Sequence, residues 1–123
     1  MGKQIGKQTI EFQQCPRISS FAAIVGPKEG EGPLACFFDQ ILGDALWGET
    51  TWEKAESKIM RETILMVVKK AALNLSDIRM IFAGDLLNQL IGSTFGIRPL
   101  GIPFFGLYGA CSTMGESLIL SAM

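Results

Sequence analysis

Apolar residues change their spacing several times along the chain, and each change predicts a new element. A β-branched and aromatic run at residues 17–25 predicts a strand that stops at Gly26. Residues 26–33 are rich in glycine and proline and predict a loop. Residues 34–46 then place apolar side chains at roughly helical spacing, which predicts a short helix.

The clearest periodic segment follows residue 50. Thr50 and Glu53 have the spacing of a capping box, so a helix is expected to begin there. The charged residues of this segment fall largely off one apolar stripe, which is the pattern of a long amphipathic helix. The stripe consists of Ala55, Ile59, Met60, Thr63, Met66, Val67 and Ala71.

The second half of the chain alternates short apolar runs with turn residues. Such alternation is typical of strands and helices that follow one another closely. The expected elements are a turn at 74–77, a strand at 78–83 ended by Gly84, a helix at 85–91, a strand at 102–108 and a helix from Ser112 onward.

The resulting order is β–α–α–β–α–β–α, which predicts an α/β fold with a parallel sheet covered by helices. Ligands of such sheets gather beyond the carboxyl ends of the strands. The loops at 26–33, 84–88 and 109–113 follow the three predicted strands and hold the unusual residues of the chain. A binding site is therefore expected where these loops meet.

Composition restricts the classes of function. The 123 residues suit one domain, and 48% of them are hydrophobic. A net charge of −1 with scattered Lys and Arg argues against a nucleic-acid binder. Three unevenly spaced cysteines without a signal peptide indicate a reduced protein that faces the cytosol. The longest uncharged run, residues 99–115, contains prolines and glycines that disfavour a membrane-spanning helix.

Cys111 stands directly before a predicted helix and allows three interpretations. The backbone N–H groups of a helix start favour an anion, so the thiol is a candidate nucleophile. The same donors, with Gly109 and Ser112 beside the cysteine, suit the carboxylate of a ligand. The third interpretation is a buried cysteine that acts as a small hydrophobic side chain.

Histidine is absent from the 123 residues. A thiol-based catalyst needs a base that activates the cysteine and donors that stabilise the developing oxyanion. A Cys-His arrangement cannot be assembled from this chain alone. Either the partner groups lie on another polypeptide, or the chain is a fragment, or Cys111 is not catalytic.

Three further polar residues lie in the predicted loops. Asp85 and Asn88 follow a strand and are candidates for hydrogen bonds to a polar ligand, with helix capping as the alternative for Asp85. Lys28 is a candidate partner for a ligand carboxylate, with a solvated lysine beside Glu29 and Glu31 as the alternative.

Three motifs carry a resemblance to a known family. VGPKEGEGPL (25–34), FAGDLLNQ (82–89) and IPFFGLYGACSTMGES (102–117) resemble, in order and spacing, the stage V sporulation protein AD family of spore-forming bacteria. The resemblance extends from about Lys7 to the last residue. More distantly, GACS before a helix is similar to the nucleophile turn of thiolases and β-ketoacyl-acyl-carrier-protein synthase III.

The resemblance implies a thiolase-like fold, which consists of two similar α/β halves. This chain would be a truncated N-terminal half, with a parallel-rich sheet and covering helices. Residues 1–16 would be an N-terminal extension and residues 17–123 an incomplete thiolase-like domain. The apolar end of the last helix would then be covered by the missing half or by a second copy.

The resemblance also implies a function, namely binding of dipicolinic acid, as its calcium complex, for uptake into the developing spore. The protein would act at the cytoplasmic side of the inner membrane, as a peripheral protein, with other stage V sporulation membrane proteins as partners. No catalysis, no cofactor and no metal site is expected, and calcium would arrive only with the ligand. The alternative is a condensing enzyme in which Cys111 accepts an acyl group. Ligand contacts are expected from Lys28, Asp85, Asn88, Gly109, Cys111 and Ser112.

Overall fold

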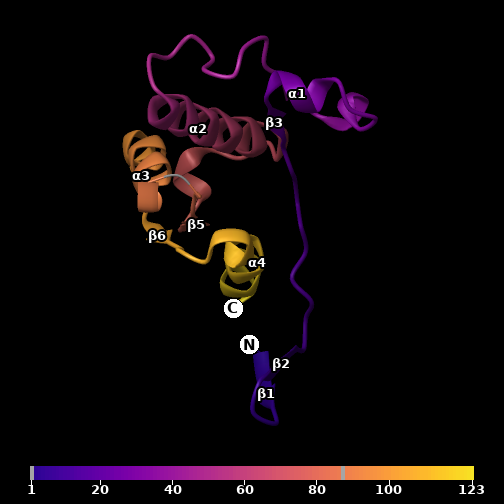
Figure 1. Ribbon diagram of the computed structural model, residues 1–123. Helices are drawn as coiled ribbons and strands as arrows, with labels where there is room; N and C mark the ends of the chain where they lie inside the picture. The colour runs from indigo at the N-terminus through magenta and orange to yellow at the C-terminus, as the bar shows by residue number, and fades with distance from the viewer. Residues whose placement is uncertain (1, 87) are drawn as a thin grey trace.

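A computed structural model describes residues 2–86 and 88–123, with the side chain of Asn88 outside the description (Figure 1). The strands are β1 (Gly2–Ile5), β2 (Thr9–Phe12), β3 (Ile24–Val25), β4 (Gln40–Ile41), β5 (Ile81–Ala83) and β6 (Phe104–Gly106). The α-helices are α1 (Pro27–Gly30), α2 (Trp52–Lys70), α3 (Ile91–Ile97) and α4 (Thr113–Ala122). Short 3-10 turns lie at Ala35–Phe37, Leu75–Asp77, Asn88–Leu90, Arg98–Leu100 and Ala110–Ser112. The predicted α/β class is confirmed.

The strands pair in twos. β5 runs parallel to β6, as predicted, and β3 runs parallel to β4, a strand that the sequence analysis did not predict. β1 and β2 form an antiparallel hairpin. The described pairs do not join into one sheet. Each parallel pair is only two or three residues long, because turn residues such as Gly26 and Gly84 follow the strands directly.

The long helix α2 is confirmed, but its N-cap lies one residue later than the capping pattern predicts. Thr51 is the N-cap, and its hydroxyl accepts a hydrogen bond from the Lys54 backbone N–H at 3.4 Å. The Thr50 hydroxyl instead accepts a hydrogen bond from the Lys54 ammonium at 3.3 Å. Lys69 and Lys70 lie in the last turn, where cations favour the negative end of the helix dipole.

Helix α3 packs along α2 and forms the core of the body (Figure 1). Ala55 of α2 is buried there, and Ile97 of α3 is 1% exposed. The other buried residues of α3 are Gly92, Ser93 and Gly96, whose small size allows the two helices to approach closely.

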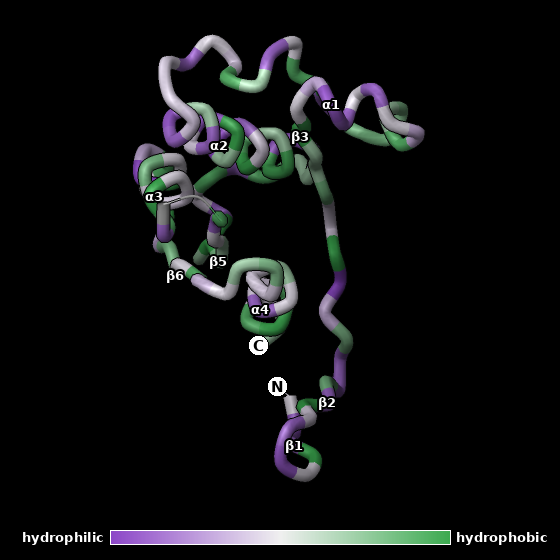
Figure 2. Tube along the Cα trace, in the orientation of Figure 1, coloured by the Kyte–Doolittle hydropathy of each residue, from purple (hydrophilic) through white to green (hydrophobic). Residues whose placement is uncertain are grey.

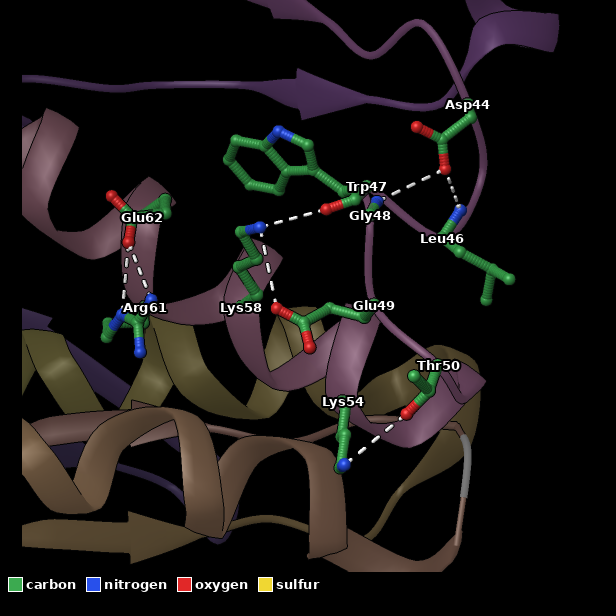
Figure 3. A network of polar contacts seen from close by, with 10 residues as sticks. All are labelled: Asp44, Leu46, Trp47, Gly48, Glu49, Thr50, Lys54, Lys58, Arg61 and Glu62. Atoms are coloured by element: carbon green, nitrogen blue, oxygen red, sulfur yellow. Dashed lines mark hydrogen bonds and ion pairs between the residues drawn. The ribbon is translucent and has the colours of Figure 1, made fainter.

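A polar network fastens the loop before α2 to that helix (Figure 3). The Lys58 ammonium donates to the Trp47 carbonyl at 2.8 Å, pairs with Glu49 at 3.4 Å and lies 4.9 Å from the centre of the Trp47 ring. The Asp44 carboxylate accepts two backbone N–H groups of the same loop. These contacts hold the chain as it enters α2.

The predicted helix at 34–46 is wrong. The structure has a 3-10 turn at Ala35–Phe37 and then strand β4. Asp39 explains the difference, because its carboxylate accepts the Ala23 N–H at 2.9 Å and the Lys70 ammonium at 2.7 Å. These contacts pull the segment alongside β3, where a helix cannot follow. The predicted loop at 26–33 contains the short helix α1, which begins at Pro27.

The N-terminal hairpin is joined to the body by an extended segment and lies near the end of α4 (Figure 1). Ile10 and Phe12 of the hairpin and Leu118 and Ile119 of α4 line a common hollow. Leu118 and Ile119 remain more than half exposed, and the last turns of α4 are strongly apolar in Figure 2. None of the helices described is long and apolar enough to span a membrane.

The Asp39 contacts predict a pH-dependent contribution to stability. The hydrogen bond from Lys70, followed by that from the Ala23 N–H, lowers the pKa of Asp39 below its ordinary value of 3.8. The stabilisation is therefore present above pH 3.8 and is lost as the pH falls through the lowered pKa. Asp39→Asn should lower the free energy of unfolding at neutral pH, and the difference from wild type should shrink on acidification. Urea denaturation over a pH series measures it, with exposed Glu31→Gln as the control.

Candidate functional site

The carboxyl ends of β5 and β6 bring two of the predicted site loops together. The Leu107 N–H donates to the Ala83 carbonyl at 2.9 Å, so the chain leaves both strands at one edge. Gly84 packs closely against the segment that follows β6. A Cβ atom at Gly84 would come 2.0 Å from the Leu107 carbonyl oxygen and 2.9 Å from the Thr113 methyl. The sequence-based placement of these two loops at one edge is confirmed.

The third predicted loop lies elsewhere. Lys28 is an exposed residue of α1, which follows β3 and contacts β4. In Figure 1, α1 lies at the opposite end of the body from the start of α4. The structure thus does not bring Lys28 beside Cys111.

Asp85 acts as a cap for α3. Its side chain is buried, with 8% of the residue exposed. One carboxylate oxygen accepts the Leu90 N–H at 2.9 Å and the other accepts the Ser93 N–H at 2.7 Å. Both oxygens therefore satisfy donors at the helix start, although Leu90 occupies the N-cap position that the capping alternative assigned to Asp85.

The predicted helix at 85–91 begins too early. α3 starts only at Ile91, because Gln89 and Leu90 have φ angles of +52° and +76°. Left-handed residues cannot continue a right-handed helix, and the Asp85 contacts hold the chain in this bend. The side chain of Asn88, a predicted ligand contact, lies outside the described part of the structure.

Cys111 lies on a tight turn between β6 and α4. Ala110 precedes it with a φ angle of +49°, a left-handed conformation that L-residues adopt rarely. The turn continues as a 3-10 helix over Ala110–Ser112 and leads into α4 at Thr113. Cys111 is exposed, which excludes the interpretation as a buried hydrophobic side chain.

Ser112, Gly109 and Glu116 form a small polar cluster at this turn. The Ser112 hydroxyl lies 2.7 Å from the Gly109 carbonyl oxygen and also within hydrogen-bonding reach of the Glu116 carboxylate. A Cβ atom at Gly109 would come 2.3 Å from that carboxylate, so a larger residue there would push the flexible Glu116 side chain aside. The Gly109 N–H donates to the Thr113 hydroxyl at 3.2 Å. Glu116 thus places a negative charge at the start of α4, a feature that the sequence analysis missed.

The comparison with known proteins identifies the family. A family model described as stage V sporulation protein AD matches residues 6–123. The chain belongs to this family. Stage V sporulation protein AD of Bacillus subtilis (strain 168) is 36% identical over 120 residues, which are 98% of this chain and 36% of the relative. The chain therefore spans about a third of the length of that relative.

A shallow hollow lies next to the turn in this stage V sporulation protein AD family member. Its volume is about 440 Å³, and it is lined by Leu86, Gln89, Ile91 and Tyr108. Tyr108 directly precedes the polar turn, and Leu86 and Gln89 come from the loop that Asp85 holds. The surface that lines the hollow is mostly polar, and Gln89 adds an amide that can donate or accept.

Metal-ligating side chains are scattered over the described ranges. Within residues 2–86 and 88–123, no group of three His, Cys, Asp or Glu side chains is placed to hold a metal ion. Near the turn, Glu116 supplies a carboxylate and Ser112 a hydroxyl.

Proposed function

We propose that this chain forms part of a sporulation protein that binds dipicolinic acid, as its calcium complex, for uptake into the developing spore. One observation carries the proposal. The family match spans the turn at 109–113, and this turn is exposed at the strand edge where α/β proteins bind ligands.

The chemistry of the edge suits a flat aromatic acid. Tyr108 offers an aromatic face to a planar ring, and the mostly polar lining of the hollow suits its carboxylates. The N–H groups at the start of α4 favour a carboxylate.

Glu116 supports the calcium complex over the free acid as the ligand. Its carboxylate at the helix start would repel a free dianion. Calcium neutralises the two carboxylates of dipicolinate and accepts further oxygen ligands, so the same Glu116 would attract the complex.

The proposed setting follows the family. The protein would lie at the cytoplasmic side of the inner membrane of the forespore, as a peripheral protein with other stage V sporulation membrane proteins as partners. The exposed apolar side chains of α4, among them Met114 and Ile119, support association with a second half or another copy.

Binding should survive loss of the thiol better than loss of Gly109. Cys111→Ala is expected to weaken the calcium dipicolinate affinity by less than about tenfold, because backbone donors hold a carboxylate oxygen of the complex. Gly109→Leu should weaken it by more than about tenfold, because the side chain would displace Glu116 and Ser112. Calorimetry of this chain, and in parallel of the full-length Bacillus subtilis relative, measures both affinities.

Gly115→Leu is the matched control. Gly115 lies in α4, and a Cβ atom there meets nothing within 4 Å, so its substitution should leave binding unchanged. No saturable heat at millimolar calcium dipicolinate with either wild-type protein would refute the proposal. Complete loss of binding in a folded Cys111→Ala protein would refute the role given to the backbone donors.

The alternative function is a condensing enzyme, which the exposure of Cys111 favours. The Cys111 thiolate would attack the carbonyl carbon of an acyl thioester, form a new thioester and release the carrier thiol. Incubation with an acyl-coenzyme A followed by intact-mass measurement tests this. A single adduct that disappears in Cys111→Ala would favour the enzyme, and exposed Cys15 and Cys36 report non-specific acylation.

A further inference from the structure

One oxygen of a half-buried carboxyl group is enclosed where α2 packs against the start of α3. Glu56 of α2 turns one carboxyl oxygen, Oε2, into this contact, where the atom is shielded from solvent and has no hydrogen-bond partner among the described residues. A Cβ atom at Gly92 of α3 would come 2.5 Å from that oxygen. The carboxyl group therefore lies directly on the α3 backbone.

The surroundings of Glu56 disfavour a charge. Burial, followed by the negative charges of Asp85 and Glu53, raises the pKa of its carboxyl group. The facing helix α3 carries no ionisable side chain, and the Ser93 hydroxyl beside Gly92 is fully buried and unpartnered within the described structure. The ion pairs on this part of α2 join Lys58 to Glu49 and Arg61 to Glu62, and neither includes Glu56.

The same helix start holds the wall of the candidate site. Asp85 accepts the N–H groups of Leu90 and Ser93, which lie on either side of Gly92. Gln89 and Ile91 of this bend line the hollow beside the turn. Ile91 adjoins Gly92, so a change in how Glu56 packs on Gly92 can move the wall of the hollow.

We infer that Glu56 is a positioning residue for the candidate site: its protonated form allows α3 to pack on α2, and its ionisation loosens the bend at Gln89 and Leu90. The proton is exchanged with solvent when the contact opens. An ionised Glu56 would lie near Asp85 in a poorly hydrated contact, which costs free energy that the open form avoids. The effect of the bend on ligand binding rests on the proposed function, whereas the packing change itself does not.

Amide hydrogen exchange tests the inference without a ligand. The open form ionises at lower pH than the packed form, so rising pH favours opening. The protection factors of the Leu90 and Ser93 amides should fall several-fold as the pH rises from below 4.5, the ordinary value for the pKa of Glu56, to neutrality. In Glu56→Gln the same two protection factors should stay nearly constant. Glu62→Gln, which removes a partly exposed charge from the same helix, should retain the wild-type profile.

Two outcomes would overturn the inference. One is an unchanged pH profile in Glu56→Gln. The other is an equal fall in protection at the Ala71 amide, at the far end of α2, because that would show global unfolding. The carboxyl carbon of Glu56, followed by NMR in the wild-type chain, gives a check that needs no variant, and a midpoint at or below 4.5 would refute it. Since no dipicolinate is present, this experiment and the calorimetry can fail independently.

Discussion

Gly84→Ala should destabilise the chain by about 3 kcal/mol, because overpacking against a fixed backbone forces the structure apart. The new methyl group would need to lie 2.0 Å from the Leu107 carbonyl oxygen, which strand pairing holds in place. The Thr113 methyl closes the same space from another side. Urea denaturation followed by circular dichroism gives the free energy of unfolding.

Gly43→Ala provides the control for this experiment. A Cβ atom at Gly43 meets nothing within 4 Å, so the substitution should change stability by less than about 0.5 kcal/mol. Equal stability of the two variants would show that β5 and the loop after β6 are not in contact. The shared edge on which the candidate site depends would then be lost.

Asp85→Ala should cost about 3 kcal/mol of folding stability. It leaves the Leu90 and Ser93 N–H groups without their acceptor, and a hydrogen bond to a charged group contributes roughly 1.5–3 kcal/mol. Removing the charge beside Glu56 offsets part of the loss. Chemical denaturation measures the change, and amide exchange at the two donors locates it.

Asp85→Asn tests how much of the stability contributed by Asp85 comes from its capping hydrogen bonds. The amide keeps one oxygen acceptor of similar shape, so it should retain about half of the capping contribution. A fully stable Asp85→Ala protein would contradict the capping role. If that variant also failed to bind calcium dipicolinate, Asp85 would be a ligand contact instead.

Local pattern was sufficient for α2 because its signal is repeated over five turns. The apolar stripe recurs from Ala55 to Ala71, and no distant contact is needed to recognise it. The N-cap was displaced by one residue because Thr50 and Thr51 can both cap a helix. Only the backbone conformation of Thr51 decides between them.

Long-range contacts explain the helix that was wrongly predicted at 34–46. Its apolar spacing suits a helix, but Asp39 binds Ala23 and Lys70, which are 16 and 31 residues away. Neither partner is visible in a local window of sequence. Strand pairing with β3 then outweighs a weak local preference.

The parts of the candidate site that strand topology positions could be predicted from the sequence, whereas the parts that side-chain packing positions could not. Parallel strands placed the loops after β5 and β6 at one edge without any knowledge of side chains. The enclosure of Glu56 depends on how closely α2 approaches Gly92, which no sequence period reveals. Glu116 was missed although its spacing of four residues from Ser112 is the usual one for paired side chains on a helix.

One torsion angle restricts the residue that can precede Cys111. Ala110 turns the chain with its left-handed φ of +49°, at a cost of roughly 1–2 kcal/mol for a residue with a Cβ atom. A β-branched side chain would add to this cost, because it crowds the backbone in the left-handed region. A small residue before Cys111 therefore keeps the free-energy cost of the corner low.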